Sequence, residues 1–258
     1  MTIDLNCDLG ESTDRAADEA LMPFITSANI ACGGHAGDDR SMQETIRAAM
    51  RHGVAIGAHP GYPDEENFGR VHMNLSRAEI EESVARQIEA LNGAAKSLSA
   101  TITHVKAHGA LYNESMTNLV LARAVALGVA KSSTDLMILG LAGSPALDRW
   151  RAMGFTVVGE AFADRRYESN GSLRSRVYPD ALITDPEQAA AQAVRIVKER
   201  TVAAIDGSVV PLNAQTICIH SDTPNAVAIA QTVRTRLDQN GIAVTSFSNR
   251  KTKFENRK

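Results

Sequence analysis

The chain opens with TIDLNCD (residues 2–8), in which apolar and polar side chains alternate. Alternation with a period of two is typical of a β-strand, because successive side chains point to opposite faces of a sheet. The residues at 3, 5 and 7 would share an apolar face, and Asp4, Asn6 and Asp8 would share a polar one. The same pattern returns in ITHVKAH (residues 102–108). We expect the apolar face of such strands to pack against helices and the polar face to line a barrel interior.

Similar short strands alternate with longer helical segments along the whole chain. Strands are expected at residues 2–7, 28–32, 54–58, 102–107, 136–141, 155–161, 216–220 and 243–247. Regular alternation of strand and helix predicts a parallel sheet. Seven or eight such units in 258 residues favour a closed α/β barrel over an open sheet. We expect one barrel domain over residues 1–250, followed by a polar tail at 251–258.

Three helices carry recognisable start signals. The sequence SRAE (residues 76–79) is a capping box, so a helix should begin there and run to about Leu98. The Asp-Pro pair at 185–186 places a capping side chain ahead of a proline at the first helical position. The Thr-Pro pair at 223–224 repeats this arrangement and predicts the start of the last long helix.

Composition and charge argue against several classes of protein. The chain has 27 Lys and Arg and 30 Asp and Glu residues, a net charge of −3, which disfavours a nucleic-acid surface and gives no attraction to a membrane. No apolar run approaches the ~20 residues of a membrane span, and the first residues do not resemble a secretory signal. The three cysteines form no CxxC pair, which argues against a disulfide framework or a thiolate zinc site. Together these features predict a cytoplasmic protein.

A group of ionisable side chains stands at the expected carboxyl ends of the strands. His35, His59, His108 and His220 each come at or shortly after a strand, and Asp8 follows the first strand. Parallel α/β proteins place their sites at these strand ends. Burying polar groups is costly unless they are paired, so this many imply a polar cavity or a ligand. We expect these five side chains to converge on one cavity.

Other polar residues leave alternatives open. Asp4 and His104 lie nearer the strand starts and suit structural hydrogen bonds. Cys218 shares a strand face with His220, so a thiol near the site is one alternative. The segment FADRRY (residues 162–167) follows a strand. Its arginines could bind a carboxylate or a phosphate, or they could form a solvated charge run.

Five motifs in order along the chain resemble those of a known family. They are DLNCDLGE (4–11), SANIACG with HAGD (27–38), GAHPGYPD (57–64), HGALYN (108–113) and FADR (162–165). This set resembles the family of prokaryotic 5-oxoprolinase A subunits, also called the lactam utilisation or LamB/YcsF family. The resemblance implies a distorted barrel of about seven strands, similar to the glycoside hydrolase/deacetylase superfamily. It also implies ATP-dependent cleavage of the lactam 5-oxoproline (pyroglutamate) to glutamate, together with partner subunits B and C.

Four residues receive catalytic roles under this interpretation. Asp8 would be a general base or an electrostatic orienter, and His59 and His108 would be general acid and base partners. Lys106 would stabilise an oxyanion or a phosphate. ATP would be a co-substrate, and because the chain has neither GxGxxG nor GxxxxGK[ST], its binding site would be built across subunits. The residues assigned to substrate binding are Asn6, Glu11, Asn29, His35, Tyr112, Glu160, Asp164, Arg165 and His220.

Two other functions remain open from the sequence. The first is a metal-dependent carbohydrate deacetylase, in which Asp8, His59 and His108 would hold a divalent metal that activates water. The second is a non-catalytic subunit that binds the lactam and delivers it to a partner. The missing nucleotide motif supports the second function, whereas the number of titratable groups at the strand ends argues against it.

Overall fold

A computed structural model describes residues 1–12 and 14–248 of the chain. Within them, seven parallel strands form a closed barrel in the order β1-β2-β3-β4-β5-β6-β9, and β9 pairs with β1 to close it. A two-residue strand, β10 (Ala243–Val244), pairs with the start of β1. The expected α/β barrel of about seven strands is therefore confirmed. The barrel strands are β1 (Thr2–Leu9), β2 (Ser27–Ala31), β3 (Ala55–His59), β4 (Ile102–Lys106), β5 (Met137–Leu141), β6 (Val157–Phe162) and β9 (Thr216–His220).

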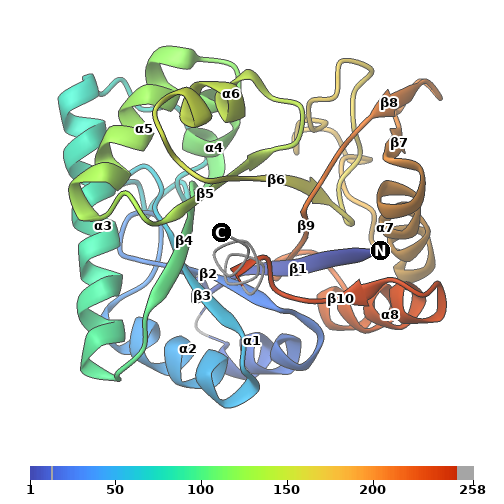
Figure 1. The fold of residues 1–258 in the computed structure, drawn as a ribbon, viewed down its shortest axis with the longest axis horizontal. Helices are drawn as coiled ribbons and strands as arrows, with labels where there is room; N and C mark the ends of the chain where they lie inside the picture. The colour runs from blue at the N-terminus through green and yellow to red at the C-terminus, as the bar shows by residue number, and fades with distance from the viewer. Residues whose placement is uncertain (13, 249–258) are drawn as a thin grey trace, which may run out of the picture.

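Helices surround the barrel on its outer side (Figure 1). The helix α3 packs against α5, and α7 packs against α8. The helices are α1 (Arg15–Leu21), the 3-10 turn η1 (Met22–Phe24), α2 (Asp39–His52), α3 (Arg77–Ser97), α4 (Gly109–Ser115), α5 (Leu119–Ser132), α6 (Pro145–Ala152), α7 (Pro186–Glu199) and α8 (Ala226–Gln239).

Two of the three helix starts lie where the sequence places them. The Ser76 side chain accepts from the Glu79 amide, and the Glu79 carboxylate accepts from the Ser76 amide, so the capping box starts α3. Asp185 caps α7 through the amide of Gln188. The start predicted for α8 at 223–224 is wrong, because this helix begins after Asn225. The Thr223 hydroxyl donates to the buried Asp164 carboxylate and so serves the barrel interior.

The strand faces agree with the alternation in the sequence. Leu5, Ile56, Val105 and Ile219, which should lie between strands and helices, are all buried at 5% exposure or less. The expectation of a polar interior is incomplete, because a small apolar cluster also lies inside the barrel. Its members are Met137, Leu139, Val158 and Phe247. Met137 and Leu139 pair in register with His104 and Lys106, which places them on the inward face of β5.

Three further features lie outside the sequence-based predictions. A short antiparallel hairpin, β7 (Thr201–Ala203) and β8 (Val209–Pro211), follows α7. The expected strand at 243–247 is reduced to the two residues of β10. The polar tail predicted at 251–258 lies outside the described residues.

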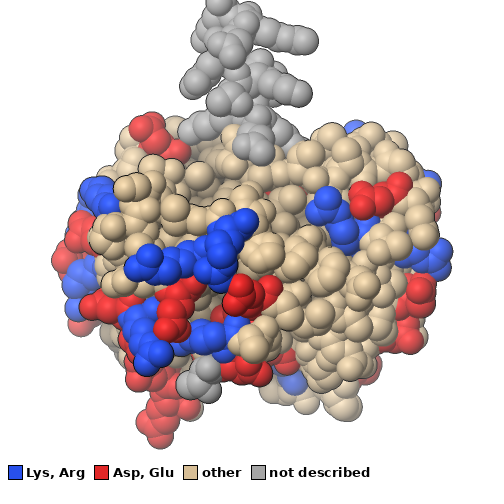
Figure 2. All heavy atoms as spheres, turned by 90° about the horizontal axis from the view of Figure 1, so that it is seen from below, with Lys and Arg blue, Asp and Glu red and all other residues tan. Residues whose placement is uncertain are grey.

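Surface charge is mixed on the face turned toward the viewer in Figure 2, where basic and acidic side chains intermingle. Ion pairs on α1 and α2 have this character: Arg15 pairs with Glu44, and Arg51 pairs with Glu19. Among the described residues, no helix combines the length and the apolar character needed to cross a membrane.

Candidate active site

A cavity of about 730 Å³ opens at the carboxyl ends of the barrel strands. Of the residues assigned to the site from the sequence, eight line this cavity: Asp8, Glu11, His59, Lys106, His108, Tyr112, Arg165 and His220. The other five are buried behind that lining: Asn6, Asn29, His35, Glu160 and Asp164. The expected convergence holds for Asp8, His59, His108 and His220, but His35 stands one layer back. It stacks on the His108 ring with a centroid distance of 3.5 Å.

The charge at the centre of the site is a buried lysine between two carboxylates. Lys106 Nζ lies 2.9 Å from Asp8 Oδ1 and 2.9 Å from Glu160 Oε1. Burial opposes the charge on Lys106, but the carboxylate of Asp8 and its other anionic neighbours outweigh it and hold the pKa of the lysine well above its usual range. Burial likewise opposes the charge on Asp8, but His59 and the Lys106 ammonium lower the pKa of this carboxyl. Lys106 and Asp8 are therefore a charged pair at neutral pH.

A layer of neutral donors holds the two carboxylates in place. Asn29 Nδ2 donates to Asp8 Oδ1 at 2.8 Å, and Asn6 Nδ2 donates to Glu160 Oε1 at 3.0 Å. The Tyr112 hydroxyl donates to Glu160 Oε2 at 2.8 Å. The three donors come from β1, β2 and α4, so three separate elements hold the two carboxylates. Among the residues assigned to substrate binding, Asn6 and Asn29 thus contact protein carboxylates.

Cys218 lies beside this network, as its shared strand face with His220 indicated. Lys106 Nζ donates to Cys218 Sγ at 3.1 Å. Burial raises the pKa of the Cys218 thiol well above its usual value, although the Lys106 charge works in the opposite direction. The thiol is therefore protonated at neutral pH and is a poor nucleophile. Cys7 and Cys32 are buried in the apolar core.

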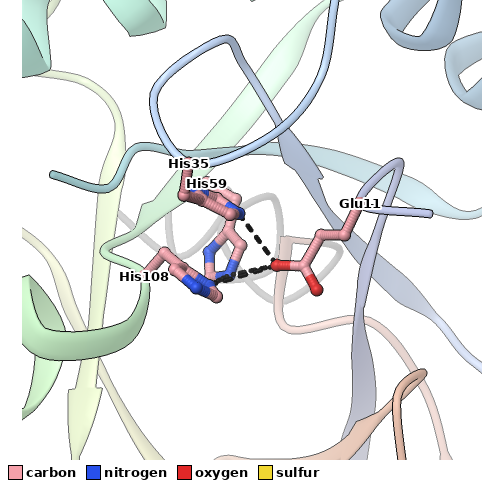
Figure 3. Close-up of side chains that lie close together, drawn as sticks. All are labelled: Glu11, His35, His59 and His108. Atoms are coloured by element: carbon pink, nitrogen blue, oxygen red, sulfur yellow. Dashed lines mark hydrogen bonds and ion pairs between the residues drawn. The ribbon is translucent and has the colours of Figure 1, made fainter. Parts of the chain in front are cut away.

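Three histidines gather around one oxygen of Glu11 (Figure 3). Glu11 Oε1 lies 2.9 Å from His35 Nε2, 3.1 Å from His108 Nδ1 and 3.5 Å from His59 Nε2. Burial opposes the charge on Glu11, but its contacts with His108 and His35 lower the pKa of this carboxyl well below its usual range. Burial also lowers the pKa of His59 to about 3. His59 is therefore neutral at pH 7.

The outer ring nitrogens of two of these histidines contact backbone carbonyls, which fixes their tautomers. His59 Nδ1 lies 2.8 Å from the Lys106 carbonyl, and His108 Nε2 lies 3.0 Å from the Phe68 carbonyl. Each of these nitrogens must donate, because a carbonyl can only accept. In the neutral tautomers, the inner nitrogens, His59 Nε2 and His108 Nδ1, then face each other at 3.0 Å as two lone pairs. Such an arrangement requires a proton or a cation between them.

Comparison with known proteins identifies the family. Residues 3–252 match the LamB/YcsF family. The chain belongs to the LamB/YcsF family. It is 51% identical over 247 residues to the 5-oxoprolinase A subunit of Chloroflexus aggregans, covering 95% of this chain and 98% of the relative. It is 48% identical to the 5-oxoprolinase A subunit of Bordetella parapertussis, covering 94% and 97%.

Two solved structures share the fold of this LamB/YcsF chain. A lactam utilization protein from Thermus thermophilus superposes with a TM-score of 0.89 at 43% identity, covering 96% of this chain and all of that one. A family 4 carbohydrate esterase from Streptomyces lividans shares the fold at 16% identity, with a TM-score of 0.53 over 94% of this chain and 91% of the esterase. The family resemblance is confirmed, and the distorted barrel that it implies is the fold shared with the esterase.

The donor set around Glu11 fits a divalent cation. The ligand atoms of Glu11, His35, His59 and His108 all lie within 4.8 Å of one another. One carboxylate and three imidazoles suit zinc or another transition metal. His35 Nδ1 is buried and has no hydrogen-bond partner among the described residues. The other ring nitrogen, Nε2, contacts Glu11, so a flip of the ring that turned Nδ1 toward the cluster would break this contact. The set predicted from the sequence was Asp8, His59 and His108. The geometry favours Glu11, His35, His59 and His108 as the metal ligands, because Lys106 already neutralises the charge of Asp8.

A second histidine unit stands on the opposite strand of the LamB/YcsF barrel. His220 Nδ1 donates to Asp164 at 3.0 Å, and the Phe162 ring stacks on the imidazole. Burial opposes the charge on Asp164, but His220 and Thr223 lower the pKa of this carboxyl. The Asp164 contact fixes the tautomer, so His220 Nε2 is the nitrogen available to a ligand. A nitrogen of His220, Asp8 and Cys218 lie within 4.8 Å of one another.

Sequence reasoning missed the residues that hold the histidine loops. Gln87 on α3 bonds both backbone groups of Gly61, accepting from its amide at 3.0 Å and donating to its carbonyl at 2.8 Å. The Phe68 carbonyl orients His108, and the Gly69 carbonyl accepts from the Ala110 amide. None of these residues has an ionisable side chain or a motif spacing that could have singled it out. Gly109 and Ala110 begin α4 directly after His108.

Proposed function

We propose that this chain is the A subunit of a 5-oxoprolinase and that its cavity carries out the ATP-dependent hydrolysis of 5-oxoproline to glutamate, together with subunits B and C. The observation that carries this proposal is the buried Lys106 between Asp8 and Glu160, set beside an imidazole cluster in a chain of this family. The names of the relatives support the substrate.

The chemistry to be explained is the opening of an unstrained amide. Water adds to the ring carbonyl carbon, the carbon–nitrogen bond breaks, and the nitrogen takes up a proton. A resonance-stabilised amide resists this attack. ATP would activate it by transferring its terminal phosphoryl group to the carbonyl oxygen, with ADP as the leaving group. Ring opening by water would then give an acyl phosphate, which a second water would hydrolyse to glutamate and inorganic phosphate. The nucleotide site would be formed with the partner subunits.

The roles of the side chains follow from their contacts. His59 is neutral and directs a lone pair into the cluster, so it can accept a proton from water, and His108 at 3.0 Å can relay it. Asp8 is bound to Lys106 and suits an orienting role better than that of a base. The Lys106 ammonium already faces Asp8, Glu160 and Cys218, so it acts on the ligand through the field of this network. His220, oriented by Asp164, is a further candidate for general acid–base work.

A metal-dependent hydrolysis is the second candidate, and one observation favours it. The two facing lone pairs of His59 and His108 beside Glu11 suit a bound cation. A divalent metal there would polarise a carbonyl and lower the pKa of a coordinated water. Under this alternative the substrate would be an acetylated carbohydrate.

The decisive experiment assays the purified chain for glutamate formation from 5-oxoproline and ATP, with and without the purified partner subunits. We expect turnover only in the complete mixture. No turnover in either mixture refutes the proposal. Stoichiometric zinc together with deacetylation of chitooligosaccharides would instead establish the second candidate.

A non-catalytic delivery role is tested in the same assay with Asp8→Asn. We expect this variant to abolish turnover of the complete mixture. A chain that only delivers the lactam would keep full turnover.

A further inference from the structure

One wall of the cavity holds a buried arginine that faces no carboxylate. Arg165 lines the cavity and is 5% exposed. Its Nη2 donates to the Arg174 carbonyl at 2.6 Å, and its Nε has no hydrogen-bond partner among the described residues. Within the same part of the chain, no carboxylate oxygen lies within ion-pair distance of this guanidinium. Burying a charge without a counter-charge is costly, so this wall is suited to receive an anion.

The charged groups around Arg165 leave a net positive charge. Arg70 and Arg176 both line the cavity, and both pair with one carboxylate, Asp222. Asp164, the residue before Arg165, is occupied by His220 and Thr223. Three guanidinium groups against two carboxylates leave one formal positive charge. Burial, and then the like charge of Arg176, lower the pKa of Arg165 to about 10, which is the effect expected of a cation lacking its counter-ion.

We propose that Arg165, assisted by Arg176, forms a subsite that binds the free carboxylate of the ligand. This inference rests on the proposed function, since 5-oxoproline carries one carboxylate beside its lactam ring. A single negative charge matches the single uncompensated positive charge, whereas a phosphate dianion would exceed it. A planar guanidinium binds a carboxylate through two parallel hydrogen bonds.

The subsite shares its cavity with the candidate catalytic groups. Arg165, His220 and Asp8 all line this cavity, and a ring nitrogen of His220 lies within 4.8 Å of an oxygen of Asp8. A ligand held by its carboxylate at Arg165 would therefore place its ring in the cavity that these groups face. Arg165 is a binding residue in this arrangement, and the histidines are left to act on the ring carbonyl.

The test compares two lactams that differ only in the carboxylate. We would titrate the full chain with 5-oxoproline and with pyrrolidin-2-one by calorimetry. The unmodified chain should bind 5-oxoproline about 10- to 100-fold more tightly, the range expected for hydrogen bonds to a charged group. Arg165→Gln should abolish this preference and leave pyrrolidin-2-one binding unchanged. Arg165→Lys should keep part of it.

A matched control comes from the same loop. Arg174 pairs with Glu168 and Asp180 and does not line the cavity, so Arg174→Gln should keep the full preference. If Arg165→Gln does not fold, Arg176→Gln provides the second variant and should weaken 5-oxoproline binding alone.

Several results would overturn the subsite. They are equal binding of both lactams, binding of neither, an unchanged preference in Arg165→Gln, or inorganic phosphate displacing 5-oxoproline at lower concentration than carboxylates do. Turnover of the complete mixture without any carboxylate preference would remove the subsite and leave the proposed function standing. A preference that depends on Arg165, without turnover, would remove the catalytic function and leave the subsite standing.

Discussion

Replacing Lys106 by Met tests the charge network at the centre of the barrel. Methionine keeps the length of the apolar side chain and removes the ammonium that lies 2.9 Å from both Asp8 and Glu160. Both carboxylates are 4% exposed or less, so water cannot replace the lost charge. The variant therefore confines two neighbouring negative groups in a site with low polarity.

The expected cost follows from this burial. Breaking a buried ion pair by removing one partner costs about 3–5 kcal/mol. For a chain of this size, each kcal/mol shifts the unfolding midpoint by about 2–4 °C, so Lys106→Met should lower it by about 6–20 °C at pH 7. An exposed pair provides the matched control. Lys131 and Glu82 are 45% and 62% exposed, and Lys131→Met should change the midpoint little.

The stability that Lys106→Met loses should become smaller as the pH falls. In the unmodified chain the pKa of Asp8 is lowered, so its contribution to stability is present above the unfolded pKa of about 4 and is lost as the pH falls below it. In the variant, burial and the neighbouring carboxylate should raise the pKa of Asp8 above its unfolded value. That penalty is full at pH 7 and disappears below about pH 4. Both changes reduce the difference in stability between the unmodified chain and the variant at low pH.

The assay is thermal unfolding followed by circular dichroism at pH 7 and pH 4. The double variant Asp8→Asn with Lys106→Met should recover part of the midpoint without recovering turnover. A midpoint within about 2 °C of the unmodified chain at pH 7 would refute the reasoning, because it is smaller than the shift expected from a buried pair. A difference in midpoint that does not narrow at pH 4 would refute it equally.

Three other substitutions give separate tests. His108→Ala should reduce turnover in the complete assay by about 10²–10⁴ while the protein still folds. A much lower midpoint with near-normal activity per folded molecule would make His108 structural. Gly57→Ala should destabilise the protein by about 1–3 kcal/mol in denaturant unfolding, because the added methyl group would overlap the His104 ring. An unchanged denaturation midpoint would contradict this packing. Ile219→Val should cost about 0.5–1.5 kcal/mol in the same measurement, and no loss would show that the site can relax.

The barrel could be predicted because its signals are local. Alternation within β1 and β4 assigns each side chain to a face without knowledge of its neighbours, and Leu5 and Val105 are buried as that assignment requires. The same alternation placed Asp8, Lys106 and His108 in the interior. Capping residues such as Ser76 act on amides three positions away, so they too can be recognised in a sequence.

The partners within the site could not be predicted, because they come from distant segments. Glu11 lies just beyond β1, and only the folded loops bring it to His35, His59 and His108. The tautomer of His108 depends on the backbone carbonyl of Phe68, which carries no sequence signal. The start of α8 was misplaced because the Thr223 hydroxyl is used by Asp164, a contact across 59 residues.

The polar interior explains how one barrel can be both stable and reactive. At the strand starts, Asp4 accepts from Thr26, Ser27 and Thr216, and burial raises its pKa to about 6 despite these bonds. Thr216 also accepts from Asn6, which donates to Glu160 near the cavity. Hydrogen bonds therefore connect the strand starts to the site at the carboxyl ends of the strands.

The stability of such an interior depends on which polar side chains are hydrogen-bonded to one another, and not only on how well the side chains fill the space. An apolar replacement of Asn6 would fill the same space and still take one hydrogen-bond partner from each of Thr216, Glu160 and Asn29. The cost of one change is therefore spread over several strands, since a partly satisfied buried network is less stable than either a complete one or an apolar core. This coupling keeps Asp8 and Lys106 in one geometry before any ligand enters, which is the preorganisation that attack on a stable amide requires.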